Sequence, residues 1–153
     1  FFRARTSIKI VTPYFVPDEM LIKALCVALR RGVSVTIVVP RRSNHRIADF
    51  ARRSFLRQMD AAGAKVCYYM PGMVHGKLIL VDDAPAITGS MNVDIRSMFL
   101  NYEIALLVYD AVLTRGLNAW VDDLVAASKQ GVKPANTLVE SIEGIGRIFA
   151  PLL

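Results

Sequence analysis

The residues best suited to chemistry in this chain lie between positions 75 and 103. His75-Gly76-Lys77 is followed by Asp82, then by Gly89-Ser90-Met91-Asn92 and Asn101-Tyr102-Glu103, so the spacing reads His-x-Lys-(x4)-Asp-(x6)-Gly-Ser-x-Asn with a closing Asn-x-Glu. The set supplies a histidine that can act as nucleophile or acid, a cation, neutral hydrogen-bond donors and a carboxylate. Such equipment suits phosphoryl transfer without a metal.

Side chains alternate across a β-strand, so residues two apart share a face. Three polar pairs in this region have that spacing and stand at the ends of apolar segments: His75 with Lys77, Ser90 with Asn92, and Asn101 with Glu103. Neighbouring strands lie about 4.8 Å apart, so we expect the three pairs to converge on one site. Gly76 and Gly89 leave room beside them.

Each residue type indicates a role in that site. The imidazole of His75 can attack phosphorus and form a covalent phosphohistidine. A carboxylate on its other ring nitrogen would fix the tautomer, and Glu103 is the candidate. Lys77 and Asn92 can hold the non-bridging phosphate oxygens, and Ser90 can add a hydroxyl donor.

Asp82 belongs to the pattern but not to the expected chemistry. It follows Lys77 by five residues, so on a regular strand its side chain faces the other way. We therefore expect it to be structural, in a turn that runs from Asp82 to Pro85. A single histidine or a single Gly-Ser-x-Asn would usually be structural as well; the joint spacing favours a functional site.

The order of elements predicts a layered α/β domain with a mixed sheet flanked by helices. Strands are expected at 7–14, 33–39, 64–69, around His75, at 86–89 and at 101–109, and helices at 17–31, from 45 or 46 onward, at 113–128 and at 137–149. We expect residues 1–132 to form the catalytic domain and residues 133–153 a helical tail. In the second helix, the spacing predicts one buried stripe: Ile47, Phe50, Ala51, Ser54 and Phe55.

Composition narrows the class of protein. Of 153 residues, 54% are hydrophobic and 21% charged, which indicates a globular domain, and the apolar runs are too short to span a membrane. The net charge of +6 favours polyanionic partners. Cys26 and Cys67 are expected to be buried, reduced thiols. Since the chain begins at Phe1, we expect a piece of a longer protein.

Two basic features near the middle of the chain have ordinary interpretations. His45 is expected to be a loop residue at a helix start rather than a catalytic group. The arginines between positions 41 and 57 are expected to form a solvated face, with lipid or nucleic-acid binding as the alternative.

The pattern from His75 to Glu103 resembles the HKD motif of the phospholipase D superfamily. Three further segments, 12–19, 71–77 and 94–103, resemble the second catalytic half of bacterial cardiolipin synthases, and Ala150-Pro151-Leu152-Leu153 fits the C-terminus of that family. The resemblance covers nearly the whole chain. It implies a phospholipase D-like fold and the C-terminal catalytic half of a cardiolipin synthase-like protein.

The resemblance implies a phosphatidyltransferase that makes cardiolipin from phosphatidylglycerol through a phosphohistidine intermediate, with no metal or other cofactor. It implies His75 as the catalytic histidine, Lys77 and Asn92 as phosphate ligands and Glu103 as the orienting group. In such enzymes the second half's histidine often acts as general acid and base, and we favour that role for His75. It also implies an anionic phospholipid substrate at the cytoplasmic face of a bacterial cell membrane.

Family enzymes combine two HKD motifs, whereas this chain has one. A complete site therefore needs a missing N-terminal half or a homodimer mate, and we expect the isolated chain to be nearly inactive. One alternative is a homodimeric HKD-type nuclease or phosphodiesterase, with nucleic acid as partner, or a phospholipase D hydrolase. A further alternative is a non-catalytic peripheral membrane module.

Overall fold

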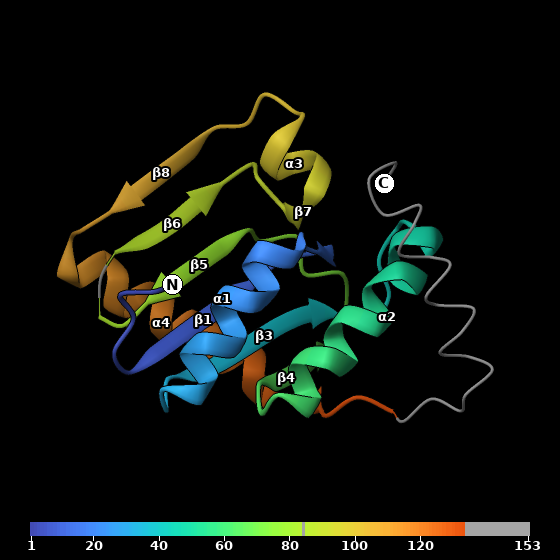
Figure 1. The fold of residues 1–153 in the computed structure, drawn as a ribbon. Coiled ribbons are helices and arrows are strands. Elements are labelled where there is room, and N and C mark those ends of the chain that lie inside the picture. Colours follow the sequence, from blue (N-terminus) through green and yellow to red (C-terminus); the bar gives the residue numbers. More distant parts are fainter. Residues whose placement is uncertain (84, 134–153) are drawn as a thin grey trace.

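The structure of the chain is a computed structural model that describes residues 1–83 and 85–133. A mixed seven-stranded sheet forms its centre, in the order β8-β6-β5-β1-β3-β4-β9 (Figure 1). The strands are β1 (Ser7–Val11), β3 (Ser34–Pro40), β4 (Lys65–Tyr69), β5 (Leu78–Val81), β6 (Ala86–Gly89), β8 (Ala105–Val108) and β9 (Ser128–Gln130). β1, β3 and β4 run parallel, and the outer strands pair antiparallel. The predicted layered α/β fold is thereby confirmed.

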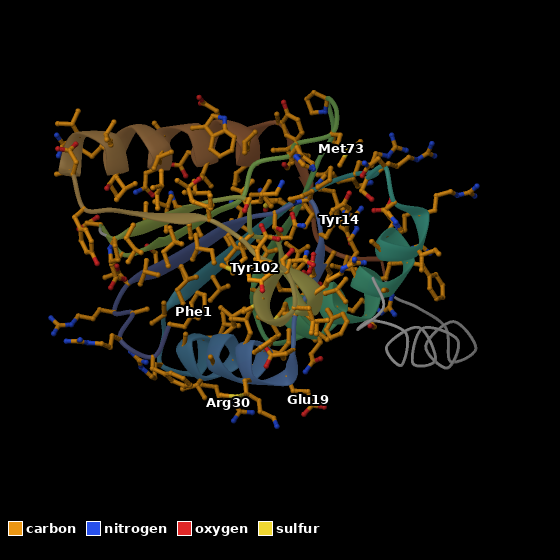
Figure 2. All side chains as sticks on the ribbon, turned by 90° about the horizontal axis from the view of Figure 1, so that it is seen from above. Phe1, Tyr14, Glu19, Arg30, Met73 and Tyr102 are labelled. Carbon is orange, nitrogen blue, oxygen red and sulfur yellow. The ribbon has the colours of Figure 1, made fainter. Side chains whose placement is uncertain are left out.

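Helices cover both faces of the sheet (Figures 1 and 2). α1 (Glu19–Arg30) and α2 (Arg46–Ala61) pack on one face, where Ile10 and Ile79 lie in their apolar core. α4 (Ala111–Ala126) packs on the other, against Val11 and Leu78. Residues adjacent in a strand thus enter different cores, as the alternation of strand side chains requires.

Local sequence explains where these elements begin and end. The Asp18 carboxylate caps α1 by accepting the N–H groups of Met20 (3.2 Å) and Leu21 (3.1 Å). Gly32 follows the helix with φ +83°, a left-handed conformation that glycine adopts without strain. The β-branched run of β3 is buried on both faces, as a central strand should be.

Two predicted strands are shorter than expected, and this places the polar pairs outside them. β5 begins at Leu78, after His75 and Lys77, and β8 begins at Ala105, after Asn101 and Glu103. The alternation argument therefore does not hold through these pairs. The predicted helix at 137–149 and all but the first residue of the 133–153 tail lie outside the described residues, so the domain boundary stays a prediction.

Four short elements were not predicted: β2 (Phe15–Val16), β7 (Val93–Asp94), α3 (Ile95–Phe99) and β9. β2 and β7 pair in parallel as a separate two-stranded sheet. In addition, Val93 N–H donates to the Thr12 hydroxyl at 3.2 Å. These contacts bind the segment after β1 to the segment that carries Asn92. Two-residue strands leave no periodic pattern, so the pairing is decided only by the tertiary fold.

The predicted stripe of α2 is wrong in part. Ile47 is 60% exposed, whereas the buried set is Ala48, Ala51, Arg52, Phe55, Leu56 and Met59. The helix is therefore turned about one position from the expected face. Its buried stripe includes an arginine, which a pattern of apolar residues cannot reveal.

Asp82 fastens the end of β5 that is remote from His75. Its carboxylate accepts backbone N–H groups from Arg5 (3.0 Å), Thr6 (2.8 Å) and Ser7 (2.9 Å), and the Thr6 hydroxyl (2.8 Å). These hydrogen bonds outweigh desolvation and lower the pKa of Asp82 to about 2. Asp82 therefore fixes β5 against the start of β1, roughly 16 Å along the strand from Lys77.

We predict that Asp82→Asn destabilises the fold by about 2 kcal/mol at neutral pH, allowing for partial solvent screening. A depressed carboxyl pKa contributes stability above its unfolded value, and that stability is lost as the pH falls toward the folded value. The difference between the two proteins should thus shrink between about pH 4 and pH 2.

Urea unfolding at a series of pH values measures this difference. Asp83→Asn, which changes the exposed neighbouring carboxylate, is the control and should have little effect. A penalty for Asp82→Asn that does not change with pH would contradict the assignment.

Candidate active site

The polar pairs meet at one edge of the sheet because of the strand directions. β5 is antiparallel to both β1 and β6, so the start of β5 lies beside the ends of β1 and β6. β8 is antiparallel to β6, and its start lies at the same edge. Residues 75–77, 90–92 and 101–103 are therefore neighbours in space although they are distant in sequence.

His75 is exposed and lies against Lys77. The Lys77 Nζ is 3.0 Å from His75 Nδ1 and donates to the His75 carbonyl at 3.0 Å. The same Nζ is 3.5 Å from the other ring nitrogen, Nε2, so the ammonium lies against the imidazole. The pair combines a cation and an imidazole at one point of the edge.

Glu103 is held by Ser90 and Asn101. The Ser90 hydroxyl donates to Glu103 Oε2, and the Asn101 amide donates to Oε1 at 3.4 Å. These donors, the Ser90 hydroxyl above all, hold the pKa of Glu103 below its ordinary value, and the Lys77 ammonium adds to the effect. The expected hydrogen bond between Glu103 and His75 is not among the contacts of residues 1–83 and 85–133, so the role of Glu103 as orienting group stays a proposal.

Asn92 is held in place by the short helix α3. Its amide donates to the Ser97 hydroxyl at 3.3 Å, and Ser97 N–H donates to Asp94 at 2.6 Å. Within the described part of the chain, the buried Asn92 Oδ1 has no hydrogen-bond partner. One polar atom of this amide is therefore left without a partner inside the described domain. Asp94-x-x-Ser97 is a helix-capping pattern that sequence reasoning did not use.

Both glycines of the pattern stand where a side chain would collide. A Cβ at Gly89 would lie 2.0 Å from the Ile104 carbonyl oxygen, because β6 approaches the start of β8 closely there. A Cβ at Gly76 would lie 2.7 Å from the Trp120 ring of α4. The ring therefore packs on the backbone between His75 and Lys77, a contact that the sequence did not predict.

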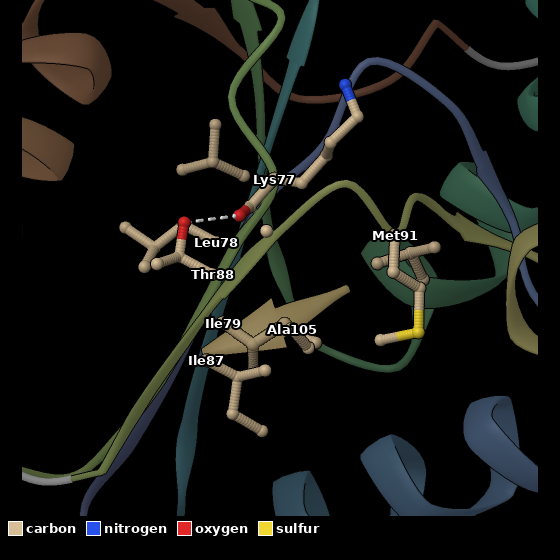
Figure 3. A pocket seen from close by; sticks show the side chains of 10 residues that line it. Lys77, Leu78, Ile79, Ile87, Thr88, Met91 and Ala105 are labelled. Atoms are coloured by element: carbon tan, nitrogen blue, oxygen red, sulfur yellow. Dashed lines mark hydrogen bonds between the residues drawn. The ribbon is translucent and has the colours of Figure 1, made fainter. Parts of the chain in front are cut away.

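Lys77 also borders a shallow hollow between β5 and β6. The Thr88 hydroxyl donates to the Lys77 carbonyl at 2.9 Å, while the Lys77 amine is directed away from the hollow (Figure 3). Burial lowers the pKa of Lys77, and the nearby carboxylates of Glu103 and Asp94 oppose that shift. The Lys77 ammonium therefore lies within electrostatic reach of both carboxylates, and Lys77 and Asn92, the expected phosphate ligands, share one edge of the sheet.

Across the described residues, no group of histidine, cysteine and acidic side chains is arranged to hold a metal.

Comparison with known proteins identifies the family. The model of the family described as "Cardiolipin synthase, PLD-like domain" matches residues 2–125. This chain belongs to that family. It is 38% identical over 128 residues to cardiolipin synthase A from both Citrobacter koseri and Klebsiella pneumoniae, a match that covers 84% of this chain and 26% of each relative. The chain thus spans about a quarter of the length of these curated relatives.

Solved structures of the phospholipase D-like fold resemble the chain along most of its length. The phospholipase D family member Nuc from Salmonella typhimurium has a TM-score of 0.74 at 24% identity and covers 86% of both chains. Phosphatidylserine synthase from Haemophilus influenzae has a TM-score of 0.75 at 19% identity, covering 99% of this chain and 42% of its own. At these identities the likeness establishes the fold.

Arg52 is a further residue that this phospholipase D-like domain places near the candidate site. Its guanidinium is only 2% exposed and donates to the carbonyls of Pro13 (3.4 Å), Pro40 (2.8 Å) and Arg41 (3.2 Å). It also pairs with Asp49 at 2.8 Å. Arg52 thus fastens together the segments that follow β1 and β3. No sequence signal distinguishes it from its exposed neighbour Arg53.

We predict that Arg52→Met costs about 3 kcal/mol of folding stability, because it removes the guanidinium from the buried carbonyls and leaves the Asp49 carboxylate with only the Ser43 N–H. Arg53→Met makes the same chemical change at an exposed position and should cost less than about 1 kcal/mol. Urea denaturation midpoints compare the two variants. Equal losses of folding stability in the two variants would show that Arg52 does not hold these segments together.

We also predict that Ser90→Ala raises the pKa of Glu103, because it removes the largest cause of the depression. Asn101→Ala removes a smaller cause and should raise that pKa less. NMR titration of the Glu103 carboxyl carbon measures both shifts. The opposite ranking would mean that Ser90 is not the principal partner of Glu103.

Proposed function

We propose that the chain is one catalytic half of a phosphatidyltransferase that forms cardiolipin from phosphatidylglycerol. The observation that carries the proposal is the placement of His75, Lys77, Asn92 and Glu103 at one sheet edge of a domain whose curated relatives are cardiolipin synthases. The anionic phospholipid is the substrate, and the membrane surface is where the enzyme meets it. No helix among the described residues is long and apolar enough to cross a membrane.

The reaction divides into two displacements at phosphorus. In the first, a histidine nitrogen attacks the phosphodiester, a phosphorus–nitrogen bond forms, and the bond to glycerol breaks as the glycerol oxygen takes up a proton. In the second, the hydroxyl of another phosphatidylglycerol gives up its proton, attacks phosphorus and releases the histidine. We assign the proton transfers to His75 and the nucleophilic role to the histidine of a second half.

Lys77 and Asn92 are the proposed ligands of the phosphate. The Lys77 ammonium would exchange the His75 ring for a non-bridging oxygen, leaving Nδ1 able to carry a proton and face a carboxylate. The unpartnered polar atom of Asn92 supports a second contact, since turning the amide over would present its NH₂ group to an oxygen. Glu103 is the proposed carboxylate that orients the imidazole.

An exposed apolar band beside this edge is the proposed contact with the second half. β8 is an edge strand, and Leu106 (61%) and Leu107 (57%) are exposed on its two opposite faces. Further exposed apolar side chains lie before and after it: Phe99, Leu100, Tyr102, Ile104, Val112 and Leu113. An edge strand of this kind favours association with another chain or domain. A partner on β8 would lie next to Glu103.

We predict that the isolated chain shows almost no phosphatidyl transfer, and that the complete two-motif protein loses roughly 10³-fold in rate on His75→Ala or Lys77→Met. Radiolabelled phosphatidylglycerol in mixed micelles provides the assay. The double variant Leu106→Asp with Leu107→Asp should prevent this domain from associating with the second catalytic half. Val27→Asp, at an exposed position on α1, should leave that association intact. Robust transfer by the isolated chain would overturn the half-site proposal.

A second candidate is a homodimeric phosphodiesterase or nuclease. It is favoured by the match to Nuc, which shows this fold in a chain of about the present length. The two candidates predict different substrates: transfer between phospholipids in one, cleavage of DNA in the other. Measuring both in one preparation distinguishes them. A second His-x-Lys-(x4)-Asp encoded upstream of Phe1 would favour the transferase.

A further inference from the structure

A large share of the formal net charge lies in one segment. Six arginines and two aspartates lie between position 41 and the end of α2 at Ala61, so this segment carries +4 of the formal net charge of +6. One of the two aspartates, Asp49, is paired with the buried Arg52. Arg41 and Arg42 are exposed in the loop that leads from β3 into α2, and Arg46 is exposed at the first position of α2. We call these three residues the arginine loop.

The arginine loop lies at the same sheet edge as His75. Arg41 N–H donates to the Tyr69 carbonyl at 2.9 Å, at the ends of β3 and β4. Tyr14, which follows β1, bonds Asn44 through its hydroxyl and meets the His45 ring edge-on at 6.4 Å. Residues 70–77 connect the end of β4 to the start of β5, so the strand order takes them past the ends of β3 and β1. The loop and the His75 segment therefore lie at the same end of the sheet.

Carboxylates near this edge are already engaged and do not neutralise the loop. Glu19 at the start of α1 pairs with Lys23 at 3.3 Å. Glu103 accepts from Ser90 and Asn101. The arginine loop thus remains a positive surface that an external anion can approach.

Exposed apolar side chains adjoin the arginines. Ile47 is 60% exposed at the start of α2, and Met70 (41%) and Met73 (37%) are exposed on the connection that leads to His75. Met73 and Tyr14 lie on the same side of the molecule in Figure 2. Arginines interleaved with exposed aliphatic groups suit a bilayer, where cations meet headgroups and apolar groups enter the acyl boundary. A duplex accommodates such side chains only by unstacking its bases, whereas a bilayer accommodates them at its acyl boundary.

We propose that the arginine loop, together with Ile47, Met70 and Met73, docks this domain on an anionic phospholipid bilayer, with the His75 edge facing the headgroups. The inference rests on the proposed function, because it presumes that the substrate arrives from a membrane. It adds the surface by which the domain reaches that substrate. Docking this edge would bring the phosphodiester layer to Lys77 and Asn92 without extracting a lipid from the bilayer.

The test is binding of the chain to vesicles, which needs no turnover. Phosphatidylcholine vesicles with and without phosphatidylglycerol are compared by co-sedimentation. Replacing Arg41, Arg42 and Arg46 by Gln should weaken binding to the anionic vesicles by about 100-fold, at about fivefold for each arginine near an anionic surface. Ile47→Ser should weaken it roughly tenfold, with a smaller dependence on salt.

The matched control replaces Arg3, Arg5 and Arg30 by Gln. These exposed arginines lie at the opposite edge of the sheet, and the variant has the same net charge as the first. It should retain binding within about threefold, because charges farther from the surface than a Debye length are screened. Equal loss in the two variants, or unchanged binding by the arginine-loop variant, would overturn the proposal.

Two further measurements separate this inference from the proposed function. His75→Ala should bind vesicles like the unaltered chain, so loss of chemistry and loss of docking are independent. A short DNA duplex serves as competitor: DNA binding that needs the arginine loop but not Ile47, in preference to vesicles, would identify a nucleic-acid surface instead. If transfer fails while vesicle binding keeps the expected pattern, the docking surface stands and only the assigned reaction falls.

Discussion

The contact between the Asp82 carboxylate and the backbone of residues 5–7 determines much of this molecule. It joins the end of β5 to the start of β1 and so sets the register of the two strands at the middle of the sheet. At its other end, β5 begins directly after Lys77, which follows His75 by two residues. A carboxylate that accepts several backbone N–H groups forms strong and directional charge-assisted hydrogen bonds. A residue remote from the reaction thereby decides where the reactive pair lies.

The edge that carries the candidate site is assembled from backbone contacts as much as from side chains. Gly89 lets β6 approach Ile104, which places Ser90 next to Glu103. Arg52 joins the segments after β1 and β3 from below, where a neutral side chain could not satisfy several carbonyls together. The polar groups of the edge therefore stand on rigid supports, which phosphoryl transfer requires because little beyond position and charge is available to accelerate it.

We propose that the same edge is one half of a complete site. The exposed His75 and the half-buried Lys77 and Asn92 lie beside an edge strand, β8, whose Leu106 and Leu107 are exposed. The curated relatives are about four times as long as the matched region. The proposed second half on β8 and the proposed lipid surface at the arginine loop would cover this edge from two sides. Chemistry and docking would then share one sheet edge, which is economical for a substrate that never leaves a membrane.

The sequence by itself determined the fold class, the core helices and strands, and the set of residues proposed to carry the chemistry. Period-two and period-3.6 patterns report burial, and the spacing of His75, Lys77, Asn92 and Glu103 is specific because several chemical types must coincide. Only the tertiary structure decided that His75 lies before β5 and Glu103 before β8, rather than within these strands. It also decided that α2 buries Arg52 rather than Ile47, and that the Trp120 ring packs on Gly76. These outcomes depend on contacts between residues far apart in the chain. A buried arginine and an exposed one look alike in sequence, because only the carbonyl groups around them differ.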